Sequence, residues 1–96
     1  MNNQNLKVNH NQEQHRFEIN FGEDSAFIDY MESEDDVIAM THTEVPQRFE
    51  GQGVGSKLVK DSLEMVKAEG KKVNPLCRFV AAYIKRHPEY NSIVAE

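Results

Sequence analysis

The first half of the chain has the hydrophobic pattern of three β-strands. Polar and apolar side chains alternate with the two-residue period of a half-buried strand. Three such stretches follow one another, at residues 16–21, 26–31 and 37–45. Gly22 opens a turn after the first, acidic residues form a turn after the second, and Pro46 ends the third. Because the turns are short, the pattern predicts an antiparallel three-strand meander.

The second half changes to the period of a helix. Gly70 ends a stretch over residues 53–69 whose apolar side chains recur at steps of three and four residues. Residues 71–76 fit a short strand, and residues 78–86 fit a second amphipathic helix that ends before Pro88. A right-handed crossover helix normally joins parallel strands, so the fourth strand is expected beside the third. The predicted fold class is α+β with a mixed sheet.

Asn and Gln dominate the first 14 residues, which therefore predict a flexible or weakly ordered arm with a weak strand at residues 6–9. Residues 15–96 are expected to form a single domain, because a chain of 96 residues has no room for a second core.

Composition and charge exclude several classes of function. The net charge of −5 gives no basic footprint for nucleic acid. The N-terminus does not resemble a signal peptide and no apolar run could cross a bilayer, so a cytoplasmic protein without a membrane partner is expected. Cys77 is the single cysteine, which precludes an intramolecular disulfide. The four histidines lack the spacing of metal ligands, and no metal site is predicted.

Glycines at alternate positions, Gly51, Gly53 and Gly55, separate the third strand from the first helix. Without Cβ atoms the backbone can approach a ligand closely. The first N–H groups of a helix have no intrahelical partner, and the helix dipole favours an anion beside them. One glycine would suffice to cap the helix, so three favour a pyrophosphate-binding loop. Its candidate residues are Arg48, Gly51, Gln52, Gly53, Val54, Gly55, Ser56 and Lys57.

Two other phosphate-binding motifs fit this loop poorly. The nucleotide P-loop requires Gly-Lys-Ser/Thr, whereas this chain has Gly55-Ser56-Lys57. The dinucleotide fingerprint requires a third glycine where Ser56 stands, and it opens a βαβ unit rather than following a meander.

A third motif matches fully. Arg48-Phe49-Glu50-Gly51-Gln52-Gly53 has the Arg/Gln-x-x-Gly-x-Gly/Ala signature of the GNAT acetyltransferase superfamily. Together with His42-Thr43-Glu44-Val45-Pro46, Pro75-Leu76-Cys77 and residues 83–90, the chain resembles a short, single-domain GNAT protein over about residues 15–90.

The resemblance implies a minimal GNAT fold, in which the strand before the loop splays away from the strand after its helix. It also implies that acetyl-CoA binds with its pantetheine arm in that cleft, beside Thr43 and Val45. The implied activity is transfer of an acetyl group to an unidentified amine acceptor, either a small molecule or a protein.

Two candidates for catalysis lie in the C-terminal third. Tyr83 resembles the tyrosine that GNAT enzymes carry after the last core strand, and its ordinary pKa near 10 suits protonation of a leaving thiolate. Cys77 precedes a helix next to Arg78, where a thiol can have a lowered pKa and accept an acetyl group transiently. The structural alternatives are a packed tyrosine ring and a small buried filler.

His42 and Glu44 share one face of the third strand, so either is a candidate general base, although strand histidines are more often structural. Seven carboxylates and no Lys or Arg lie between Glu23 and Asp36. They could attract a cationic amine, although such residues are more often solvated turns.

The chain lacks the helices that larger GNAT domains insert between the first two strands. The acceptor site is therefore expected to be reduced, open or completed by another chain, and the protein a monomer or a weak homodimer. An acyl-CoA-binding module with little or no transferase activity is the main alternative function. A small interaction domain that uses an exposed sheet edge is a third hypothesis.

Overall fold

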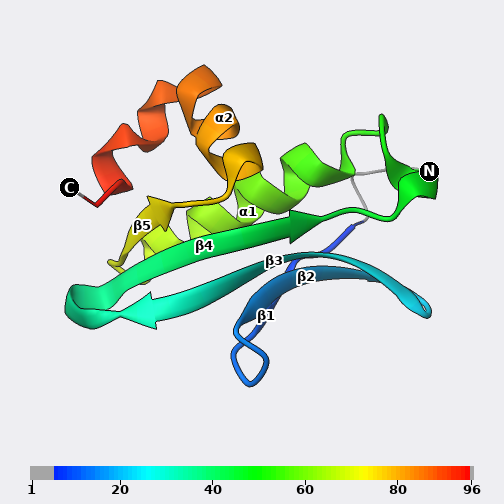
Figure 1. Cartoon of the computed structure of the whole chain (residues 1–96), viewed down its shortest axis with the longest axis horizontal. Coiled ribbons are helices and arrows are strands. Elements are labelled where there is room, and N and C mark those ends of the chain that lie inside the picture. The colour runs from blue at the N-terminus through cyan, green and yellow to red at the C-terminus, as the bar shows by residue number, and fades with distance from the viewer. Residues whose placement is uncertain (1–5, 96) are drawn as a thin grey trace.

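The computed structural model describes residues 6–95 (Figure 1). Strands precede the first helix, as the sequence pattern predicts. In chain order the elements are β1 (Asn9–Asn11), β2 (Arg16–Phe21), β3 (Asp24–Ser33), β4 (Val37–Glu44), α1 (Val54–Ala68), β5 (Lys72–Pro75) and α2 (Arg78–Arg86), with short 3₁₀ helices η2 (Glu34–Asp36), η3 (Gln47–Phe49) and η4 (Pro88–Ile93).

The strands form one mixed sheet in the order β1-β2-β3-β4-β5. Neighbours from β1 to β4 are antiparallel, and β5 pairs with β4 in parallel. The predicted meander, the parallel strand after the first helix and the α+β class are therefore confirmed. Figure 1 shows α1 passing behind β4, with α2 and η4 close to β5.

The N-terminal segment differs from the expected arm. The strand expected at residues 6–9 lies at Asn9–Asn11, where it pairs with β2, and Val8 is buried in the core. The described part of this segment is thus packed against the sheet. Residues 1–5 of the expected arm lie outside the described residues.

The core is a single layer of apolar side chains between the sheet and the helices. The predicted apolar face of α1 is fully buried, and Val80 and Ile84 bury one face of α2. Ser62 also lies in the buried face of α1, with its hydroxyl unpaired. The sheet contributes Phe17, Ile28 and Met40, among other side chains. The core therefore fixes α1 against the sheet, and with it the loop that precedes α1.

The C-terminal residues cover the edge of β5. Tyr90 and Ile93 in η4 are buried, Val94 bridges to Val73, and the Ala95 N–H donates to the Val73 carbonyl at 2.8 Å. The Tyr90 hydroxyl donates to Glu64 of α1 at 2.6 Å. The end of the chain thus ties β5 to α1. Within residues 6–95, neither helix has the length and apolar character to span a membrane.

Candidate functional site

A cleft opens where β4 and β5 separate. The two strands pair from Val37↔Lys72 to Met40↔Pro75, and the pairing then ends. Pro75 has no N–H to extend the ladder. The Cys77 N–H donates to the Met40 carbonyl at 2.9 Å, and the chain then leaves the sheet to form α2. β4 continues to Glu44 beside β3 alone, so one side of its C-terminal half faces the cleft.

A bulge changes the direction of β4 at the same point. Asp29 pairs with His42, while the next residue of β3 pairs with Met40, which leaves Thr41 as an extra residue in β4. Bulges re-aim backbone and side chains and are common next to functional sites. Beyond the bulge, Thr43 shares the helix-covered face of the sheet with Ile28, and His42 and Glu44 lie on the other face.

The glycine loop lies across the cleft from β4. Gly51 and Gly53 have φ values of 77° and 79°, in the left-handed region that favours glycine, and Gly53 is the N-cap of α1. The first hydrogen bond of α1 runs from the Lys57 N–H to the Gly53 carbonyl at 3.1 Å. The N–H groups of Val54, Gly55 and Ser56 precede that bond and have no intrahelical acceptor. This arrangement suits an anion.

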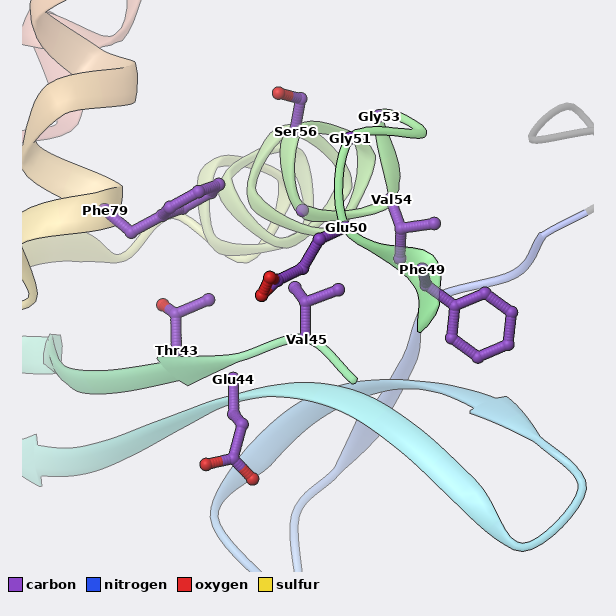
Figure 2. A pocket seen from close by; sticks show the side chains of 11 residues that line it. Thr43, Glu44, Val45, Phe49, Glu50, Gly51, Gly53, Val54, Ser56 and Phe79 are labelled. Carbon is purple, nitrogen blue, oxygen red and sulfur yellow. The ribbon is translucent and has the colours of Figure 1, made fainter. Parts of the chain in front are cut away.

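The loop and the free side of β4 enclose a cavity of about 520 Å³ (Figure 2). That volume lies in the range of small-molecule sites. Most of the predicted cofactor-binding residues line it, namely Thr43, Val45, Gly51, Gly53, Val54, Gly55 and Ser56. The remaining wall consists of Glu44, Phe49, Glu50 and Phe79. Segments that are separate in the sequence thus form one site.

Three predicted cofactor residues do not line this cavity. Arg48 pairs with Asp24 of β3, at 2.7 Å between Nη2 and Oδ2. Lys57 pairs with Asp61 one turn along α1 at 2.8 Å. The Gln52 amide donates to the Arg48 carbonyl at 3.0 Å, which closes the loop on itself. The two cations thus already have carboxylate partners beside the cavity.

Of the four catalytic candidates, only Glu44 lines the cavity. Its carboxylate is 3.5 Å from His42 Nε2, and both side chains are more than half exposed. Figure 2 shows the Glu44 side chain pointing away from Thr43, toward the other face of the sheet. The structure therefore brings His42 and Glu44 together on the face that the helices leave uncovered.

Cys77 and Tyr83 belong to the N-cap and the interior of α2, and neither lines the cavity. Cys77 is the N-cap of α2, and its sulfur is 3.1 Å from the Thr43 hydroxyl. Tyr83 stacks on His87, with ring centroids 4.1 Å apart. Burial raises the pKa of Tyr83 above its ordinary value, and Glu89, Asp61 and Glu64 raise it further. The hydroxyl thus stays protonated through the neutral range, but it is not part of the cavity wall.

A second cavity of about 560 Å³ adjoins the first and shares Glu44, Val45 and Glu50 with it. Its wall comes from the β2–β3 turn, the start of β3, the end of β4 and the residues after β4, namely Glu23, Asp24, Ser25, Phe27, Glu44, Val45, Pro46, Gln47 and Glu50. Four of these nine carry carboxylates, and neither Lys nor Arg is among the lining residues that the structure describes. Nor do the described residues contain a cluster of three groups that could hold a metal ion.

Sequence reasoning missed three residues of the first cavity: Phe49, Glu50 and Phe79. Phe49 is buried and stacks on Phe21, so nothing in the pattern separates it from the core. Phe79 offered a signal, because it is a large aromatic residue next to the buried positions of α2 and yet remains exposed.

Comparisons with known proteins agree with this geometry. The sequence model of the GCN5-related N-acetyl-transferase family matches residues 16–93. The mouse protein NATD1 is 27% identical over 85 residues, covering 86% of this chain and 77% of that protein. Zebrafish NATD1 is 28% identical over 89 residues, covering 88% and 81% respectively.

A solution structure of a Staphylococcus aureus protein described as GCN5-like superposes with a TM-score of 0.71 at 27% identity. The match covers 99% of this chain and 91% of that one. With the family model matching most of the chain, and with the splayed strands and glycine loop in place, this chain belongs to the GCN5-related N-acetyltransferase (GNAT) family.

Proposed function

We propose that this protein transfers an acetyl group from acetyl-CoA to a cationic amine. The family supports the class of reaction. The observation that carries the proposal is the first cavity, which joins the start of α1 to the unpaired side of β4. One end offers backbone N–H groups to an anion, and the other end opens beside a strand whose backbone is available for hydrogen bonds.

The residues present fit acetyl-CoA as a substrate. The pyrophosphate would accept hydrogen bonds from the N–H groups of Val54, Gly55 and Ser56. Arg48 and Lys57 would add positive charge only by sharing or leaving their carboxylate partners Asp24 and Asp61. The Arg48–Asp24 pair is exposed, and exposed ion pairs contribute little stability, so releasing Arg48 costs little, whereas the Lys57–Asp61 pair is half-buried. The pantetheine arm would lie along β4, between Thr43 and Val45.

Glu44 is the proposed general base because it lines both cavities. Its carboxylate would take a proton from the ammonium group, directly or through water, and His42 lies close enough to share that proton. The neutral amine would then attack the thioester carbonyl, whose developing charge backbone N–H groups near Thr43 would stabilise. As the carbon–sulfur bond breaks, the departing thiolate takes up a proton, and the nitrogen gives up a proton to become the amide, which restores the proton donor. The candidate donors are Tyr83 and Cys77, and the Cys77 sulfur contacts the Thr43 hydroxyl.

The second cavity supports a cationic acceptor. Glu23, Asp24, Glu44 and Glu50 surround it, and a positive amine would be attracted to their charge. Arg48 offsets part of that charge through Asp24.

The test is release of free CoA from acetyl-CoA, measured with a thiol reagent, against a polyamine, a lysine peptide and an uncharged amine. We expect the two cationic acceptors to be used in preference to the uncharged one. Glu44→Gln should lower kcat by about 10²–10⁴-fold, the usual range for loss of a general base, while leaving acetyl-CoA affinity unchanged. If the unaltered protein binds acetyl-CoA tightly but releases no CoA in response to an acceptor, the proposed transferase activity would be rejected.

That last outcome would favour the alternative, an acyl-CoA-binding module without transferase activity. Two observations support this alternative. The turn at Gly22 and Glu23 stands where larger relatives insert acceptor-binding helices, and Cys77 and Tyr83 lie outside the cavity wall. Calorimetric measurement of acetyl-CoA binding distinguishes the transferase and the acyl-CoA-binding module from an interaction domain. An interaction domain should bind acetyl-CoA with a Kd weaker than about millimolar.

A further inference from the structure

Phe79 is an exposed aromatic side chain with a defined position in the site. It lies in the first turn of α2 and is 45% exposed, while its neighbour Val80 is fully buried in the core. The ring lines the first cavity. Figure 2 shows it extending from α2 toward the first turn of α1, on the side of Thr43 that faces the cavity. The ring therefore bridges the two helices across the mouth of the cleft rather than filling the core.

Gly55 makes room for this ring. Its φ lies outside the left-handed region, unlike those of Gly51 and Gly53, so its backbone conformation would accept another residue. A Cβ at position 55, however, would lie 2.7 Å from Phe79 Cζ and 3.2 Å from Cε1. Alanine is otherwise strongly favoured over glycine within a helix. An alanine at position 55 would therefore have to displace the Phe79 ring.

We infer that Phe79 is the wall on which the pantetheine arm of an acyl-CoA packs, and that Gly55 is a positioning residue that lets the ring occupy that place. The inference rests on the proposed use of acetyl-CoA. The site has two chemically different ends: N–H groups from Val54 to Ser56 suit phosphates, whereas Phe79 and Val45 offer apolar surface to an alkyl-amide chain. An exposed ring gains from being covered by such a chain, because apolar surface is removed from water.

The experiment compares two ligands by calorimetry. Acetyl-CoA carries the arm, whereas adenosine 3′-phosphate 5′-diphosphate keeps the phosphates and lacks it. Phe79→Ala should weaken acetyl-CoA binding about tenfold, since half a ring of contact surface is lost, and should change binding of the diphosphate less than about twofold. Phe79→Leu, the matched control, retains apolar surface and should lose less. Thermal unfolding of each variant shows whether the fold is intact.

Gly55→Ala provides the second arm of the test. It should not lower the thermal midpoint, because alanine favours the helix, and yet it should weaken acetyl-CoA binding selectively by displacing the ring. In Phe79→Ala the same substitution should have little further effect, since no ring remains to be displaced.

Two results would overturn the inference while leaving acetyl-CoA binding established. One is wild-type affinity in Phe79→Ala. The other is that Gly55→Ala weakens binding of both ligands equally and that its effect adds fully to the effect of Phe79→Ala. That result would mean that the glycine serves phosphate binding instead. Failure of the unaltered protein to bind acetyl-CoA would instead reject the proposed function, and this inference with it.

Discussion

Thr43 and Cys77 are 34 residues apart in the chain, and their side chains meet 3.1 Å apart beside the cleft. Thr43 lines the first cavity, so the thiol approaches the site through its hydrogen-bond partner. Tyr83, by contrast, stacks on His87, and burial together with the charges of nearby carboxylates raises its pKa. At the scale of single residues, Cys77 is therefore the stronger candidate to protonate or attack at the thioester.

Substitutions at both positions test this ranking. Cys77→Ala is expected to lower kcat at least tenfold, whereas Tyr83→Phe should retain activity within about threefold, because its ring can still stack. Cys77→Ser is the matched control, since serine can keep the hydrogen bond to Thr43 but lacks the acidic thiol. Wild-type rates in Cys77→Ser, together with a large loss in Tyr83→Phe, would assign proton donation to the tyrosine. Steady-state kinetics at saturating acetyl-CoA is the measurement.

Tyr90 gives a pH-dependent prediction about stability. Burial and the hydrogen bond to Glu64 raise the pKa of Tyr90 well above its ordinary value of 10. The protonated form is thus favoured in the folded state. Its contribution is fully present below pH 10 and is lost as the pH rises above 10 toward the folded-state pKa. At pH 7 the free energy of unfolding should exceed that of Tyr90→Phe by about 1–3 kcal/mol, the range for a hydrogen bond to a charged group.

Urea denaturation of both proteins between pH 7 and pH 11 measures this difference. Other tyrosines and lysines titrate in the same range, but they titrate in both proteins and cancel in the comparison. A difference between wild type and Tyr90→Phe that stays constant across this range would contradict the assignment.

At the scale of elements, α1 holds the glycine loop in place because both of its ends are defined. Gly53 begins the helix in the left-handed region. At the other end, Gly70 has a φ of 72°, its N–H donates to the Lys67 carbonyl, and the Lys71 N–H donates to the Val66 carbonyl. This pair of bonds is the Schellman motif. The chain therefore turns directly from α1 into β5, which pairs with β4 from its first residue.

Gly70→Ala should destabilise the protein by about 1–2 kcal/mol, because alanine in the left-handed region is strained. A Cβ at this position would meet nothing within 4 Å, so no steric clash adds to that value. Gly70→Asn is the control and should lose less, since asparagine tolerates this conformation. Equal losses from both substitutions, measured by chemical denaturation, would show that backbone strain is not the cause.

At the scale of the whole molecule, charge is distributed unevenly around the site. The chain carries a net charge of −5, and four carboxylates line the second cavity. The start of α1, with its positive dipole end, lies on the opposite side of the shared residues Glu44 and Glu50. The two cavities thus suit ligands of opposite charge.

Salt should therefore affect the two classes of acceptor differently. Raising NaCl from about 20 to 300 mM is expected to lower kcat/KM for a polyamine several-fold and to change that for an uncharged amine little, because salt screens exposed charges. Glu23→Gln should reduce the salt dependence, since Glu23 lines the acidic cavity. Equal salt dependence for both amines would contradict a charge-selected acceptor. The cytoplasmic location and the monomer or weak dimer stay predictions.

Local rules allowed much of the fold to be read from the sequence. Alternation of polar and apolar residues predicted β2, β3 and β4, and apolar residues at steps of three and four predicted α1. Gly70 marked the end of α1. These predictions were possible because each signal acts within a few residues. The loop from Gly51 to Ser56 was also recognisable, since glycine spacing and the N-terminus of a helix are local features. The parallel fourth strand followed from the handedness of crossover connections. Sequence by itself thus determined the main elements, their order and the presence of a glycine loop at the start of α1.

Only the tertiary structure decided which distant residues meet. Arg48 and Lys57 were expected at a phosphate and have carboxylate partners, and Tyr83 is not among the residues that line the cavity. The contact between Gly55 and Phe79 and the one between Thr43 and Cys77 join segments that no local pattern connects. The physical reason is that packing of α1 and α2 on one sheet sets these distances jointly, through a core built from the whole chain. The glycine loop could therefore be identified from the sequence, while the shape and charge of the cleft around it depended on the fold.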